Sequence, residues 1–192
     1  YPWYVLVELT DTRVDSGLAE LLETELGLAV ADGALCDGTV AATESQARAL
    51  WSLRENISEA QKREGVSIKH DVSVPIGAIP AFIERAGEKL AAAYPGVRVI
   101  CFGHLGDGNL HYNQSRPLQS ENAAFIACTP EVNEIVYGVV RELGGSISAE
   151  HGIGQLKRDV LAFYKEPVEL EMMRRIKAAF DPCGTMNPGK VL

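Results

Sequence analysis

The sequence of 192 residues lacks paired cysteines, long apolar runs and an excess of basic residues. Its four cysteines are scattered without a C-x-x-C pair, which argues against a zinc knuckle or redox dithiol and favours reduced thiols. No apolar run approaches the roughly 18 residues that a membrane-spanning helix needs, and no leader with a basic start opens the chain. The net charge of −8 argues against nucleic acid as a partner. These absences predict a soluble, cytoplasmic protein that binds anions only through local groups of charges.

An apolar content of 46% is sufficient for one domain with a sizeable core, so we expect residues 1–192 to form a single domain. The chain opens with Tyr1 instead of Met, and residues 3–9 already resemble a buried strand. We therefore expect the chain to be part of a longer protein.

Helices and strands alternate along the predicted structure. Apolar residues at helical spacing predict helices over residues 16–26, 44–64, 80–94, 129–143 and 167–180. Extended runs predict strands over residues 3–9, 66–74, 98–104, 109–114 and 146–150, with an interrupted strand region between residues 29 and 41. Hairpins with intervening helices favour the α+β class. We predict a ferredoxin-like antiparallel sheet with helices on one face, followed by a C-terminal helical extension.

Two of the four histidines lie in one predicted hairpin. If Asp107 and Gly108 form a two-residue turn, His104 faces His111 directly across the ladder. Their Cβ atoms would then be about 4.5–5.5 Å apart, close enough for both rings to bind one cation. Asn113 would lie on the same face. The pair indicates a metal site, and the alternative is a hairpin whose glycines serve only the turn.

Glu150 and His151 follow the predicted strand at residues 146–150. Neighbouring strand residues point to opposite faces, so one of the two would bind metal and the other would transfer protons. Histidine suits proton transfer because its pKa lies near neutrality. The alternative is a helix-start carboxylate beside a histidine that only packs.

Three segments together resemble a known family: FGHLGDGNLH at residues 102–111, SAEHGIG at residues 148–154 and NPGK at residues 187–190. They are similar to the C-terminal region of FAD-linked D-2-hydroxy-acid dehydrogenases, which include D-lactate and D-2-hydroxyglutarate dehydrogenases and a glycolate oxidase subunit. The resemblance implies that residues 1–192 are the substrate- and metal-binding cap domain of a larger enzyme. Because no glycine-rich pyrophosphate loop precedes the first helix, we expect the N-terminal FAD-binding domain to be absent from this chain.

The resemblance also implies a role for each candidate residue. The implied ligands of a divalent metal, usually zinc, are His104, His111 and Glu150, and the implied catalytic base is His151. The implied substrate contacts are Arg54, Ser58, Lys69 and Asn113, and the implied flavin contact is Asn187.

These residues would form one device for oxidising a 2-hydroxy acid to the 2-oxo acid. The metal would lower the pKa of the substrate hydroxyl, and His151 would accept its proton while a hydride passes to FAD. Two cations, Arg54 and Lys69, suggest two substrate anions. We therefore expect a dicarboxylate such as D-2-hydroxyglutarate over D-lactate or glycolate. The alternatives are an ordinary helix partner for Arg54 and an ion pair of Lys69 with Asp71.

Two other kinds of function stay open at this point. The chain could be an autonomous metallohydrolase, or an interaction domain that a metal stabilises and that catalyses nothing. Two histidines and a carboxylate also suit manganese or iron. Under the enzyme hypothesis the isolated chain is inactive, its partner is its own FAD domain, and a homodimer is possible. We expect His70 to be structural or exposed, and residues 157–159 to form a solvated helix turn.

Overall fold

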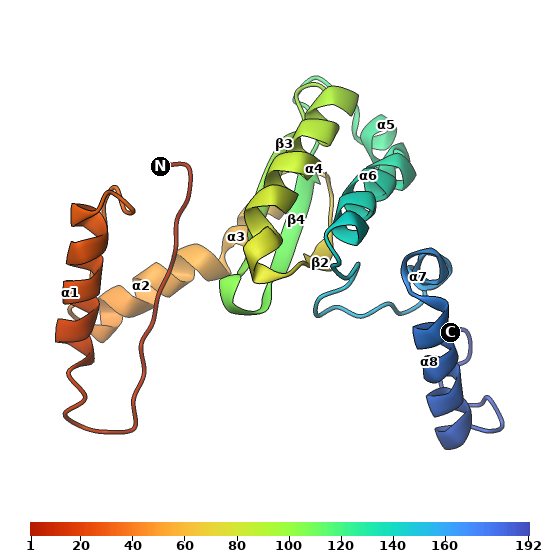
Figure 1. Cartoon of the computed structure of the whole chain (residues 1–192). Helices are drawn as coiled ribbons and strands as arrows, with labels where there is room; N and C mark the ends of the chain where they lie inside the picture. The colour runs from red at the N-terminus through yellow and green to blue at the C-terminus, as the bar shows by residue number, and fades with distance from the viewer. The chain divides into compact units, whose positions relative to one another are not determined.

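The computed structural model describes residues 1–192, and its contacts divide them into two compact units (Figure 1). The first unit comprises residues 1–63 and the second comprises residues 64–192. Helices together with a small antiparallel sheet confirm the predicted α+β class. No helix is both long and apolar enough to cross a membrane.

The first unit contains helices and no strand. Its helices are α1 (Leu18–Ala31), α2 (Glu44–Glu55) and α3 (Ile57–Glu64), the last of which ends one residue into the second unit. Thr43 caps α2 by accepting a hydrogen bond from the backbone N–H of Gln46 at 3.3 Å. The predicted continuous helix over residues 44–64 is interrupted at Asn56, where α2 ends and α3 begins.

The predicted strands of the first unit were wrong. Residues 3–9 are exposed and have no regular structure, and residues 29–31 belong to α1. A strand is stable only where a second strand supplies partners for its backbone N–H and C=O groups, and this unit has none. The sequence pattern shows the apolar residues but not whether such a partner exists.

The second unit is built on an antiparallel sheet. The central strand is β4 (Asn109–Ser115). Strands β1 (Ser67–Ile68) and β2 (Asp71–Ser73) pair one after the other with one edge of β4, and β3 (Arg98–His104) pairs with its other edge. A single antiparallel bridge joins Ser73 to Ser146 beyond β2. The resulting strand–helix–strand–strand–helix–strand order confirms the ferredoxin-like prediction, although the strand predicted at residues 146–150 is reduced to that one bridge.

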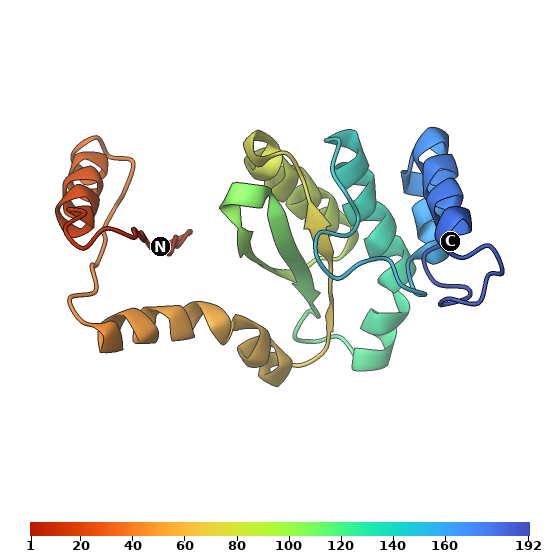
Figure 2. The same ribbon diagram turned by 90° about the horizontal axis from the view of Figure 1, so that it is seen from below.

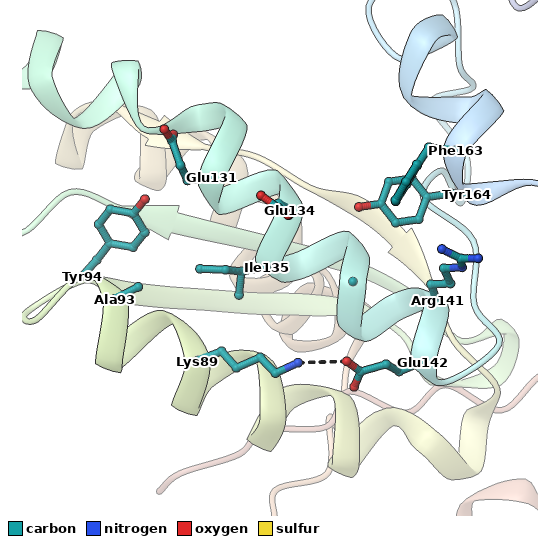
Figure 3. Close-up of a pocket in the computed structure, with 11 residues that line it drawn as sticks. Lys89, Ala93, Tyr94, Glu131, Glu134, Ile135, Arg141, Glu142, Phe163 and Tyr164 are labelled. Atoms are coloured by element: carbon teal, nitrogen blue, oxygen red, sulfur yellow. Dashed lines mark hydrogen bonds and ion pairs between the residues drawn. The ribbon is translucent and has the colours of Figure 1, made fainter.

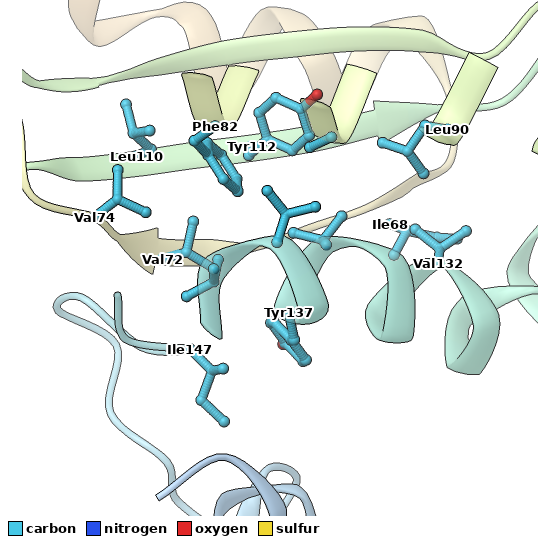
Figure 4. Close-up of a cluster of buried hydrophobic side chains, with 14 of the residues drawn as sticks. Ile68, Val72, Val74, Phe82, Leu90, Leu110, Tyr112, Val132, Tyr137 and Ile147 are labelled. Atoms are coloured by element: carbon cyan, nitrogen blue, oxygen red, sulfur yellow. The ribbon is translucent and has the colours of Figure 1, made fainter. Parts of the chain in front are cut away.

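Two helices cover one face of this sheet, α4 (Ile79–Ala93) and α6 (Thr129–Glu142), as Figures 1 and 2 show. Both agree with the predicted helices within one residue at each end. Their apolar residues recur every four positions and meet the sheet in one core (Figure 4). This core includes Phe82, Ala86 and Leu90 of α4, Val132, Val136 and Val140 of α6, and Val72, Leu110 and Tyr112 of the sheet.

Strand alternation sends the intervening residues to the opposite face of the sheet. In β4, Leu110 and Tyr112 belong to the core, so His111 and Asn113 face away from the two helices. In β2, Val72 belongs to the core and Asp71 faces away with them. The side of the sheet that α4 and α6 leave uncovered therefore carries the polar candidate residues.

The rest of the second unit is helical or irregular. The predicted helix at residues 167–180 is confirmed as α8 (Pro167–Phe180). One helix was not predicted, α5 (Asn122–Ala127), and α7 (Arg158–Tyr164) was predicted only as a helix turn at residues 157–159. Each has about two turns or fewer, which is too short for a clear helical periodicity. Two short 3-10 helices, η1 (Ile76–Ala78) and η2 (Leu105–Asp107), complete the structure.

Candidate active site

The hairpin at residues 98–115 is shifted from its predicted register. His104 pairs with Asn109, and His111 pairs with Phe102, so the predicted direct pairing of His104 with His111 was wrong. The loop has four residues, with η2 followed by Gly108. The side chain of Asp107 accepts a hydrogen bond from the backbone N–H of Asn109 at 3.0 Å and stabilises this longer turn. The two histidines share a face but are diagonal neighbours.

The loop ends at Gly108, a position that only glycine can occupy. Its φ of 71° lies in the left-handed region, and a Cβ atom there would lie 2.0 Å from the backbone oxygen of Val74. The backbone oxygen of Gly108 in turn accepts a hydrogen bond from the N–H of Val74 at 3.1 Å. The turn is thus fixed by a contact with the chain beyond β2, which sequence alone does not reveal.

Three residues form one row across the sheet on the uncovered face. His111 of β4 pairs with Asp71 of β2 on one side and with Phe102 of β3 on the other. The rings of His111 and Phe102 lie 4.9 Å apart between centroids. This row places the His111 imidazole in a largely buried position, with 15% of its side chain exposed.

Glu150 and His151 meet this row from the segment after the Ser73–Ser146 bridge. Glu150 Oε1 lies 3.1 Å from His111 Nε2, and the ring centroids of His111 and His151 are 5.4 Å apart. The potential metal-binding atoms of Asp71, His111, Glu150 and His151 all lie within 4.8 Å of one another. The structure therefore brings together three of the predicted site residues and adds Asp71.

The environment of His111 favours its neutral form. Burial lowers the pKa of His111 below its ordinary value, although the charges of Glu150 and Asp71 act in the opposite direction. A neutral imidazole is the form that binds a metal ion. The side chain is therefore suited to coordination at neutral pH.

His104 lies apart from this group. Its side chain is 55% exposed, and its Nδ1 atom is 3.9 Å from Asp107 Oδ2. Diagonal neighbours across an antiparallel pair are about 7–8 Å apart, a distance that long or aromatic side chains can still bridge. Its assignment as a metal ligand stays a prediction.

Asp71 is the residue that sequence reasoning missed. It was considered only as an ion-pair partner of Lys69, yet its side chain is 4% exposed and accepts hydrogen bonds from residues 148–151. Burial by itself raises the pKa of Asp71, but the backbone N–H groups of His151 and Glu150 outweigh it and lower the pKa below its usual value. One signal was available in the sequence: a carboxylate within a strand whose neighbours, Val72 and Val74, are apolar.

The predicted substrate residues fall in both units. Arg54 lies in α2 and Ser58 in α3, and both belong to the first unit. In the second unit, Lys69 is exposed at the break between β1 and β2. Asn113 is buried, and its Oδ1 atom accepts a hydrogen bond from the backbone N–H of His70 at 3.2 Å. The implied flavin contact, Asn187, is exposed in the C-terminal loop, with a φ of 49°.

Two other predictions concerned His70 and residues 157–159. His70 is structural, as expected: its Nε2 atom lies 2.9 Å from Asn133 Oδ1, and burial lowers its pKa to about 4. Residues 157–159 were expected to form a solvated helix turn; Arg158 and Asp159 are exposed, but Lys157 is partly buried, so the prediction was wrong for Lys157. Its Nζ atom donates a hydrogen bond to the backbone oxygen of Ile147 at 2.8 Å, and burial lowers the pKa of the amine. The sequence did not show that residue 157 would meet the strand-like segment that precedes Ser148.

A groove on the outer side of the helices is separate from this group (Figure 3). It is lined by exposed and partly buried residues of α4, α6 and α7, and Lys89 pairs with Glu142 across it at 3.0 Å. Neither the predicted site residues nor Asp71 line it. The groove therefore does not contribute to the candidate active site.

Comparison with known proteins agrees with the family resemblance. Residues 1–191 match the family described as FAD linked oxidases, C-terminal domain. The chain belongs to this family. It is 39% identical to D-2-hydroxyglutarate dehydrogenase of Stutzerimonas stutzeri (strain A1501) over 193 residues. The aligned region covers 99% of the chain and 40% of that relative. It is 38% and 36% identical to the mitochondrial D-2-hydroxyglutarate dehydrogenases of Bos taurus and Rattus norvegicus, over 100% of the chain and 34% of each relative. The chain thus spans two fifths or less of the length of these relatives.

Proposed function

We propose that this chain is the substrate- and metal-binding cap of an FAD-dependent D-2-hydroxy-acid dehydrogenase. The preferred substrate is D-2-hydroxyglutarate or a similar dicarboxylate, and the product is the 2-oxo acid. The observation that carries this proposal is the convergence of His111, Glu150 and His151 in a member of the FAD linked oxidase family. The names of the relatives support the substrate class.

The residues present fit a divalent metal ion. His111 and Glu150 already place a nitrogen and a carboxylate oxygen 3.1 Å apart, and burial keeps the imidazole neutral. His104, on the same face of the sheet, would complete the set. Two imidazoles and a carboxylate suit zinc, and also manganese or iron. When bound, the metal would supply Lewis-acid stabilisation to the substrate oxygens.

His151 is the proposed base. Its side chain is 65% exposed beside His111 and Glu150, so a substrate can reach the imidazole. Oxidation breaks the substrate C2–H bond with its electron pair, and FAD supplies the acceptor for that hydride. The proton of the substrate hydroxyl passes to His151. The two transfers together convert the hydroxy acid to the oxo acid.

Charge selects the substrate in this proposal. In a chain with a net charge of −8, Arg54 and Lys69 are the cations proposed to bind a carboxylate beyond the one bound near the metal. Ser58 and Asn113 would add neutral hydrogen-bonding partners. A dicarboxylate uses both cations, whereas D-lactate and glycolate leave one of them without an anion.

The FAD-binding part of the protein is the proposed partner of the second unit. Four apolar residues of α8 recur every four positions and are 57–79% exposed: Val168, Met172, Ile176 and Phe180. Such a stripe is typical of a helix that another domain covers. Asn187, in the loop that follows, would then lie near the flavin. A homodimer and a cytoplasmic location stay predictions, and the rat and cattle relatives are named mitochondrial.

The function is tested on the purified full-length enzyme. We expect bound FAD, seen by its absorbance, and anaerobic reduction of that FAD by D-2-hydroxyglutarate faster than by D-malate, D-lactate or glycolate. A colourless full-length protein that hydrolyses esters or amides would support the metallohydrolase alternative instead. An unaffected His151→Ala variant would support the non-catalytic alternative.

The metal ligands are tested by elemental analysis. His104→Ala and His111→Ala should each lower the bound metal, because each removes a nitrogen donor. His70→Gln is the matched control, since His70 is a buried histidine that faces α6. Normal metal content in the His104 variant would remove this residue from the ligand set.

A further inference from the structure

One carboxylate holds the whole segment that carries Glu150 and His151. Asp71 Oδ2 accepts hydrogen bonds from the backbone N–H groups of Ala149 (3.0 Å), Glu150 (3.2 Å) and His151 (2.9 Å), and from the hydroxyl of Ser148 (3.2 Å). Residues 148–151 belong to no helix or strand, so these three amides have no partner from regular structure. Asp71 supplies that partner.

Asp71 is itself held rigidly. It lies in β2, where it pairs with His111 of the central strand, and only 4% of its side chain is exposed. The segment at residues 148–151 therefore takes its position from the sheet through one buried side chain. Groups that orient active residues in this way are usually packed and hydrogen-bonded themselves.

The same contacts argue that Asp71 Oδ2 is not a metal-binding atom, although Asp71 lies among the candidate ligands. Four donors already surround Oδ2 within 3.2 Å. Coordination through this atom would remove those hydrogen bonds and leave backbone N–H groups of the segment unpaired, which costs free energy. Oδ2 is thus occupied by the protein, whereas Oδ1 accepts only a long hydrogen bond of 3.4 Å from the N–H of Glu150.

We propose that Asp71 is the positioning residue of this active site, fixing the backbone of residues 148–151 so that Glu150 meets His111 and His151 faces the substrate. The inference rests on the function proposed above and deepens it. The predicted strand at residues 146–150 would have pointed Glu150 and His151 to opposite faces. Because that strand is reduced to the bridge at Ser146, both side chains reach the group around His111.

The positioning acts through the backbone of His151 and not through its ring. The His151 N–H lies 2.9 Å from Asp71 Oδ2, whereas the His151 Nδ1 atom is 3.9 Å away, beyond hydrogen-bond distance. An amide oxygen can also accept backbone hydrogen bonds, but without a charge it accepts them more weakly. Asparagine should therefore preserve part of what alanine removes.

The test uses the full-length holoenzyme with Asp71→Ala, Asp71→Asn and Asn133→Ala. Asn133→Ala is the matched control, because it removes a partly buried hydrogen bond to His70 on the helix side of the same sheet. Hydrogen–deuterium exchange of residues 146–154, bound metal per protein, kcat and KM are measured for each.

Asp71→Ala should accelerate exchange in this segment, lower the bound metal and reduce kcat by about 10–100-fold, the usual effect of losing such a supporting group, with a smaller change in KM. Asp71→Asn should show the same changes to a lesser degree, and Asn133→Ala should lower only the Tm.

Three results would overturn the inference. Normal exchange, metal content and kcat in Asp71→Ala would show that the contact is dispensable. Loss of metal with unchanged exchange at residues 146–154 would make Asp71 a ligand. If the alanine variant does not fold, Asp71→Asn decides, and wild-type exchange and kcat in that variant would refute the positioning role. A wild-type enzyme whose FAD no 2-hydroxy acid reduces would refute the proposed function, while exchange and metal content would still test Asp71.

Discussion

The two units of this chain differ in what they bury. The apolar core residues all belong to the second unit, between Ile68 and Leu170. In the first unit α1 and α2 contain no buried residue, and α3 buries only Gln61. The residues proposed for the chemistry, His111, Glu150 and His151, lie in the unit with the core, whereas Arg54, a proposed substrate contact, belongs to the unit without one.

The largest effect should come from His151. Replacing it with alanine should lower kcat for D-2-hydroxyglutarate by about 10²–10⁴-fold, because a positioned base contributes this much to proton transfer. The side chain is 65% exposed, so the Tm should change little. Stopped-flow reduction of FAD measures the first effect and thermal denaturation the second. A large loss of Tm would mean that the residue supports the fold.

Two truncations test the difference in buried core between the two units. Phe82→Ala removes a fully buried ring that contacts Tyr112 at 5.0 Å and should lower the free energy of unfolding by about 3–5 kcal/mol. Leu21→Ala in α1, where the side chain is 50% exposed, should cost about 0.5 kcal/mol or less. Urea denaturation compares the two variants. Equal losses would show that the first unit has a core of its own.

The stability of the second unit should depend on pH through His70. Burial lowers its pKa from 6.5 to about 4 in the folded state, so between these values the unfolded state binds more protons. The free energy of unfolding should therefore decrease as the pH is lowered from 6.5 to 4, by about 3 kcal/mol over the whole interval. The groups around the ring are Asn133, Tyr137, Gln114 and the cation of Lys157. Denaturation between pH 7 and pH 4 should show a shallower fall in His70→Gln than in the wild type.

The smallest effect should come from Arg54, and it should differ between substrates. Arg54→Ala should lower kcat/KM for D-2-hydroxyglutarate relative to D-lactate by about 10–150-fold, the equivalent of one charged hydrogen bond of about 1.5–3 kcal/mol. Steady-state kinetics with both substrates gives the ratio. Equal losses for the two substrates would contradict the assignment of Arg54 to the second carboxylate.

Elements with clear boundary signals were predictable from the sequence. Pro80 at the start and Pro95-Gly96 at the end delimited α4, and two extended runs around a glycine-containing turn located β3 and β4. The hairpin register was not predictable, because Asp107-Gly108 fits both a two-residue turn and the end of a four-residue loop. In the structure the four-residue loop also brings Gly108 into a backbone hydrogen bond with Val74, a contact between distant segments that the sequence pattern does not show.

The reactive side chains of the candidate site were predictable from the sequence, but the residue that positions them was not. Glu150, His151 and His111 were identified because their side chains are chemically distinctive. Asp71 was not, since its partners are mostly backbone amides, which every residue possesses and no sequence pattern marks. Supporting contacts of this kind become visible only when distant segments are placed together.

The bridge between Ser73 and Ser146 adds a mechanical consequence. Its two backbone hydrogen bonds, at 3.0 and 2.8 Å, attach the chain to β2 just before the segment that Asp71 holds. A segment attached at one point can pivot about it, but one attached at two points cannot. The strand of three residues, β2, therefore holds this part of the chain at two points, and between them Ile147 is buried in the core and accepts a hydrogen bond from Lys157 Nζ, so the proposed base is fixed from several sides.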